Sequence, residues 1–210
     1  MLATLICFLA MPTAGETTLE PTDDVWVYQF AEDQTTDEYL RVWSGDGQAV
    51  GEIGDGHMSF SYSCLKFDTS KVDAKTVTKA KLVLTCAGSA SFTLEDSKKN
   101  PLEARSLTTD WNEASWAYEK SKTVHPMKDP ATIFGGGFGA TTNDSDFKIE
   151  IDLMKGPADF KKQLAGAQGQ IAIALTSTLC PEGQGEGFVY KLYSKSNDQA
   201  KRPKLVLSTD

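Results

Sequence analysis

The chain has 210 residues, of which 40% are hydrophobic, 10% aromatic and 24% charged, a balance typical of a globular domain rather than a disordered or fibrous protein. It carries 21 basic and 29 acidic residues, so its formal net charge is −8. No overall positive field is available to attract phosphate backbones or anionic lipid, and we expect no nucleic-acid partner. One β-sandwich can bury most of a chain of this length, so we expect a single domain.

The first segment, MLATLICFLAMPTAG (1–15), has no charged side chain, and its apolar stretch is too short to span a bilayer. Thr13 and Gly15 are the small residues that suit a signal-peptidase site, although a basic n-region is missing. We therefore predict a signal peptide over 1–15, a domain over 16–210, and a secreted protein with no membrane contact after cleavage. An apolar N-terminal strand is the alternative interpretation.

Short stretches in which apolar and polar residues alternate, bounded by Gly, Asn, Asp, Ser or Pro, predict β-strands along the rest of the chain. Their ranges are 25–30, 38–43, 59–68, 80–87, 91–96, 146–153, 170–177, 187–194 and 203–208. Strands joined by turns in this way indicate an all-β fold, an antiparallel β-sandwich.

A single short helix is predicted in GPADFKKQLAGAQG (156–169), where Pro157 suits the first turn and Phe160 and Leu164 lie one turn apart. Gly-rich stretches are expected to form surface loops, and they cover 45–56, 135–139 and 183–187.

Cleavage of the signal peptide would leave Cys64, Cys86 and Cys180, with no CxxC or Cys/His spacing that would indicate zinc. Alternation places Cys64 with Lys66 on one strand face and Cys86 with leucines on the other, which disfavours a disulfide between these two cysteines. Cys86 is expected to be a core thiol, and the pairing of the three cysteines stays open.

Three segments of the chain, taken in order, resemble the DNRLRE-domain family, which includes carbohydrate-binding modules of family 96. They are LKFDTSKVDAKTVTKAKLVLTC (65–86), LTTDWNEASWAYEK (107–120) and YKLYSKSNDQAKRPKLVLS (190–208). The resemblance implies a jelly-roll β-sandwich with polysaccharide-binding activity, found on secreted bacterial proteins. The chain departs from the family at Ser194-Lys195-Ser196, where the family commonly has an acidic residue, so no role of that acid is carried over.

Candidate catalytic groups are few. His57 and His125 lie in predicted loops and belong to no HxH, HExxH or Ser/His/Asp arrangement. We therefore expect no enzyme activity, although pairs among the acidic residues keep a polysaccharide lyase or hydrolase as an alternative.

No cofactor is expected, and structural calcium stays open. Oxygen ligands suited to calcium are supplied by Asp23, Asp24, Asp46, Asp55, Asp144 and Asp146. The alternative is that these are solvated turn residues, because Asp is common in turns.

The candidate binding surface lies on the outward faces of the predicted strands. We expect alternation to bury Leu40, Leu65 and Leu192, together with Phe67 and Tyr190. The residues turned outward are then Tyr39, Arg41, Trp43, Lys66, Lys191 and Tyr193. On neighbouring strands these rings and cations would share one surface. Aromatic rings stack on the CH face of a pyranose, and Lys and Arg bind hydroxyls or uronate carboxylates. Ordinary cross-strand pairing explains the same residues equally well.

Together these features predict a secreted, monomeric, non-catalytic domain that binds polysaccharide through an aromatic and basic sheet face. A uronate-containing glycan is one option, but a net charge of −8 would repel a polyanion unless the basic residues cluster. The alternative is an extracellular structural or adhesion protein with no glycan ligand.

Overall fold

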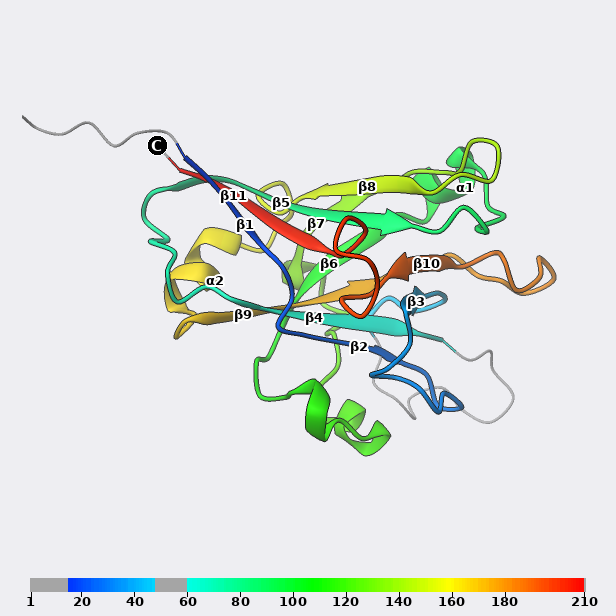
Figure 1. Cartoon of the computed structure of the whole chain (residues 1–210), viewed down its shortest axis with the longest axis horizontal. Helices are drawn as coiled ribbons and strands as arrows, with labels where there is room; N and C mark the ends of the chain where they lie inside the picture. The colour runs from blue at the N-terminus through cyan, green and yellow to red at the C-terminus, as the bar shows by residue number, and fades with distance from the viewer. Residues whose placement is uncertain (1–14, 48–59, 210) are drawn as a thin grey trace, which may run out of the picture.

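The computed structural model describes residues 15–47 and 60–209, and its strands form two antiparallel sheets packed face to face (Figure 1). The predicted class, an all-β sandwich with one short helix, is confirmed. The predicted signal peptide, apart from Gly15, lies outside the described residues, as do Asp55 and His57. Within the described residues, no helix is long and apolar enough to cross a bilayer.

The first sheet, here sheet A, is organised around its longest strand, β5 (Val77–Cys86). One edge of β5 pairs with β8 (Phe147–Asp152), and the other pairs with β11 (Lys204–Thr209) and, at Cys86, with β10. Sheet A is completed by β1 (Gly15–Leu19) beside β11 and by β3 (Tyr39–Val42) beside β10 (Tyr190–Tyr193). The β3–β10 pair therefore forms one end of the sheet.

The second sheet, sheet B, has the strand order β2, β4, β9, β6 and β7. These strands span Asp23–Val27, Tyr62–Asp68, Gln170–Thr176, Leu102–Leu107 and Ile133–Gly137. The predicted helix is α2 (Phe160–Gly166), which begins after the N-cap Asp159 rather than at Pro157 and buries Phe160 and Leu164, the two residues predicted to lie one turn apart. The ring of Phe160 contacts that of Phe134 on β7 at a centroid distance of 5.2 Å.

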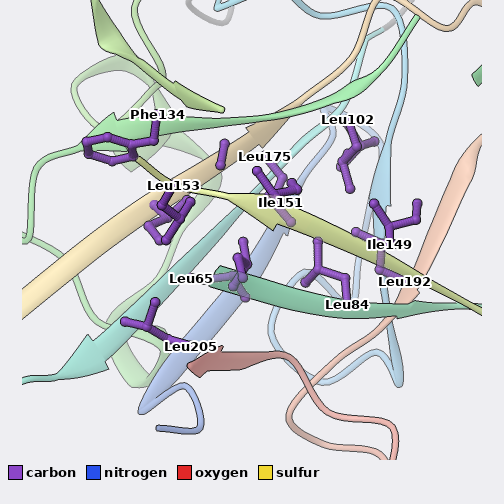
Figure 2. Close-up of a cluster of buried hydrophobic side chains, with 14 of the residues drawn as sticks. Leu65, Leu84, Leu102, Phe134, Ile149, Ile151, Leu153, Leu175, Leu192 and Leu205 are labelled. Atoms are coloured by element: carbon purple, nitrogen blue, oxygen red, sulfur yellow. The ribbon is translucent and has the colours of Figure 1, made fainter. Parts of the chain in front are cut away.

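The main core lies between the two sheets, where alternate residues of each strand meet. Figure 2 shows Leu65 and Leu175 of sheet B together with Leu84, Ile149 and Leu192 of sheet A, all fully buried. Full burial of one such side chain stabilises the fold by about 1.5–3 kcal/mol. The core therefore holds the sheets together and fixes which faces of β3 and β10 point outward.

The outer face of sheet B is covered as well, which alternation alone does not predict. The segment between β6 and β7 contains the short 3-10 helices η1 (Glu113–Ser115), η2 (Tyr118–Lys122) and η3 (Pro130–Thr132). It packs beyond β2 and β4 (green in Figure 1) and forms a second buried cluster with the outward residues of the sheet. Its members include Trp111, Val124, Cys64, Ala172 and Ala174.

Residues 91–96, predicted as a strand, instead lead into the helix α1 (Leu94–Lys99). Thr93 and Asp96 form a capping box, in which each side chain accepts the other residue's backbone N–H. The alternation in this segment was too short to outweigh the capping signal.

The stretch 135–139, predicted as a surface loop, contains the end of strand β7. A Cβ atom on Gly135 would lie 2.2 Å from the carbonyl oxygen of Asp152 on β8. Glycine is required because β7 of sheet B lies close against the backbone of β8 in sheet A, so Gly135 indicates tight packing rather than a flexible loop.

Candidate functional site

Four of the predicted site residues meet on the β3–β10 pair. In the register of these strands, Lys191 lies opposite Arg41 and Tyr193 lies opposite Tyr39. The Lys191 ammonium nitrogen is 4.0 Å from the centroid of the Tyr39 ring, and the Tyr39 and Tyr193 rings are 5.1 Å apart. The structure thus places cations and aromatic rings side by side at the end of sheet A.

The Arg41 guanidinium is fixed by two contacts. It donates a hydrogen bond to the Asp37 carboxylate, and it lies 4.6 Å above the centre of the Trp26 ring. The Asp37 side chain is itself held by the backbone N–H of Tyr39. Preorganisation of this kind reduces the entropy lost when a ligand binds.

A cleft of about 690 Å³ opens beside these strands. It is lined by Arg41, Lys191 and the side chains of Trp26, Tyr28 and Trp43, together with residues of the segment 181–189 that include Glu186 and Val189. Pockets with apolar walls and a few polar groups are typical binding sites for small molecules and sugars.

Trp43 does not point freely outward as predicted, because it is only 8% exposed. Beyond β3 the chain leaves sheet A and forms an isolated bridge between Trp43 and Ser61, next to sheet B. The alternation that holds within β3 therefore ends at Val42. The Trp43 indole packs in the core and contributes to the wall of the cleft.

Lys66 lies on the other sheet, so the prediction that it belongs to this surface was wrong. Its side chain points away from the main core, onto the outer face of sheet B, as alternation requires. The segment between β6 and β7 covers this outer face, so Lys66 is only 4% exposed. Its ammonium group donates to the Trp111 carbonyl, lies 4.9 Å from the Trp111 ring centre and is 3.6 Å from the Asp23 carboxylate.

Tyr193 lies at the far end of the β3–β10 pair, but it is only 7% exposed, so the prediction that its side chain points freely outward does not hold. Its hydroxyl donates to Asp146 at 3.0 Å and accepts from Lys201 at 3.0 Å, and Lys201 also pairs with Asp146 at 2.8 Å. Burial, with the hydrogen bond to Asp146, keeps the pKa of Tyr193 above its ordinary value although the bond from Lys201 lowers it. A phenol held protonated in this way is a poor base at neutral pH.

Several of the described basic residues are paired with carboxylates. These pairs are Lys81 with Glu150, Lys195 with Glu113, Lys201 with Asp146 and Arg202 with Glu20. At the cleft, Arg41 is paired with Asp37, and Glu186 lines the same space as Lys191. The positive and negative charges of the site are therefore nearly balanced.

The buried Asp24 links the chain after β10 to Glu113 and Lys195. Asp24, 2% exposed, accepts the backbone N–H of Lys195, whose side chain pairs with Glu113 at 2.9 Å. Next to Lys195, the Ser194 hydroxyl donates to the Asp37 carbonyl. These contacts thereby anchor the chain after β10 to the segment that carries the partner of Arg41.

The described residues contain no group of three or more His, Cys, Asp and Glu side chains that could hold a metal ion. The described histidine, His125, has Nδ1 3.1 Å from the Pro126 carbonyl oxygen. Cys64 and Cys86 lie in the two different buried clusters and are not disulfide-bonded, while Cys180 is exposed. Burial raises the pKa of both buried thiols, that of Cys86 to about 12, so neither is a ready nucleophile.

Sequence reasoning missed Tyr28 and the segment 181–189 as parts of the site. The first had a usable signal, because alternation in 25–30 places Tyr28 on the same side as Trp26. The second had none, since the position of a loop across a cleft depends on tertiary contacts.

No family model matches the chain, and no curated protein matches it. The resemblance to DNRLRE domains therefore remains a prediction that depends on the segments quoted above.

Proposed function

We propose that this chain is a secreted, non-catalytic domain of the DNRLRE type that binds polysaccharide in the cleft beside β3 and β10. The observation that carries the proposal is the strand register, which sets Lys191 against Arg41 and Tyr39 against Tyr193 at the edge of a 690 Å³ cleft. Rings offer stacking surfaces for the CH faces of sugars, and the two cations offer hydrogen bonds to hydroxyls.

Affinity gel electrophoresis tests the proposal, with separate gels containing xylan, mannan, mixed-linkage glucan, alginate or pectin. We expect at least one polymer to retard the wild-type chain. Lys191→Ala and Tyr39→Ala should each weaken retardation about tenfold, because each removes one partner of the contact between the Lys191 ammonium group and the Tyr39 ring.

Lys79→Ala is the matched control. Lys79 is also an exposed lysine on sheet A, but it lies opposite Ser208 on β11, roughly 23 Å along β5 from the contact with β10. Its removal should leave retardation unchanged. Failure of every polymer to retard the wild type, or equal behaviour of the Lys191 and Lys79 variants, would refute the proposal and favour a structural or adhesion role. Release of reducing or unsaturated ends would indicate an enzyme.

A further inference from the structure

Aromatic rings continue beyond the cleft on the side of β2. Trp26 and Tyr28 are stacked with centroids 6.0 Å apart, and Phe30 contacts Tyr28 edge-on at 5.5 Å. Exposure increases along this row, from 6% at Trp26 to 68% at Phe30. Phe30 therefore ends the row with a ring that is accessible to a ligand.

This row is linked to the β3–β10 surface through Arg41. The Arg41 guanidinium covers Trp26, and Arg41 lies opposite Lys191 in the strand register. From Lys191 the contacts pass to the Tyr39 ring and then to Tyr193. These contacts define a track of seven residues, Phe30, Tyr28, Trp26, Arg41, Lys191, Tyr39 and Tyr193, four of which line the cleft. Trp26 and Tyr193 are nearly buried, so the groups that a ligand can reach are Phe30, Tyr28, Arg41, Lys191 and Tyr39.

The length and charge of the track indicate the class of ligand. The ring–ring and ring–cation contacts along the track each measure between 4.0 and 6.0 Å. Because several of them follow one another, a single sugar or a disaccharide would cover only a part of the track. Arg41 is paired with the Asp37 carboxylate, and the Glu186 carboxylate lines the same cleft as Lys191. A polyanion would gain little attraction here and would meet the repulsion of a chain with net charge −8.

We propose that the ligand is an uncharged linear polysaccharide bound along an internal stretch of its chain, with Phe30 forming an outer subsite. This inference rests on the proposed glycan-binding function. It predicts that affinity increases with chain length and that Phe30 contributes only when the ligand is long enough to reach it.

The test uses calorimetric titration with xylo-, manno- and gluco-oligosaccharides from disaccharide to hexasaccharide, and with oligoalginate of matched length. For at least one neutral series, the hexasaccharide should bind more than tenfold more tightly than the disaccharide. Phe30→Ala should weaken hexasaccharide binding about threefold to tenfold and leave disaccharide binding unchanged. Phe138→Ala is the control, since Phe138 is 52% exposed but lies next to Lys98 outside the track.

Three results would overturn the inference while leaving glycan binding intact. They are equal affinities for the disaccharide and the hexasaccharide, equal behaviour of the two phenylalanine variants, and tighter binding of oligoalginate than of every neutral series. Absence of binding to any of these sugars and to the parent polymers would overturn the inference together with the proposed function.

Discussion

Substitution of the buried Asp24 is expected to change how stability depends on pH. Burial raises the pKa of the Asp24 carboxyl group from 3.8 to about 7, and the neighbouring Glu113 and Asp23 carboxylates act in the same direction. The hydrogen bond from the Lys195 backbone and the charge of its side chain lower the pKa but do not offset the burial. The folded protein therefore keeps a proton that the unfolded chain releases above about pH 4, and stability decreases as the pH rises toward 7.

The magnitude follows from the difference between the folded and unfolded pKa values, which is about three. At about 1.36 kcal/mol for each pKa unit, the folded wild type is destabilised by about 4 kcal/mol at pH 8 relative to pH 4. Asp24→Asn keeps the shape of the side chain and an oxygen that can accept the Lys195 N–H, but it carries no charge. The variant should match the wild type near pH 4 and exceed its unfolding free energy by up to about 4 kcal/mol near pH 8.

Urea unfolding followed by tryptophan fluorescence, repeated at intervals from pH 4 to pH 8, measures this difference. Asp110→Asn is the control, because it removes the same charge from a side chain that is 93% exposed. Its unfolding free energy should follow the wild-type profile. A constant difference between Asp24→Asn and the wild type across the pH range would refute the reasoning, since it would mean that Asp24 is ionised in the folded protein throughout.

Further substitutions test how the two sheets and the covering segment are packed. Gly135→Ala should destabilise the fold by about 2–3 kcal/mol in urea unfolding, because its Cβ would meet the Asp152 carbonyl at 2.2 Å. Gly136→Ala, whose nearest neighbour lies at 3.6 Å, should change stability by less than about 1 kcal/mol, and equal losses would contradict the close approach of β7 to β8. Lys66→Ala should lose about 3 kcal/mol of stability, because it removes the buried ammonium group that pairs with Asp23 and donates to the Trp111 carbonyl, but should keep polysaccharide retardation. Reduced retardation in folded Lys66→Ala protein would restore this lysine to the binding site.

Strand alternation in the sequence was sufficient to predict the sandwich and much of the surface at the end of sheet A. In β3 and β10 the period of two determines the side of each residue relative to Leu40 and Leu192, and the strand pairing then brings Tyr39, Arg41 and Lys191 together. The helix over Phe160–Gly166 was likewise predictable, because its cap and its buried residues are local in sequence.

The other features depend on contacts between residues distant in the chain, and only the tertiary structure decides them. Alternation gave the correct outward direction for Lys66, but whether an outward face meets solvent depends on the segment folded over it. The same reason explains why Trp43 is buried where the chain crosses toward sheet B. Charges follow the same rule, since the sequence gives their number, whereas the ion pairs that balance Arg41 and Lys201 form only in the folded chain. Local periodicity therefore determined which side of a strand each residue occupies, and long-range packing determined what that side faces.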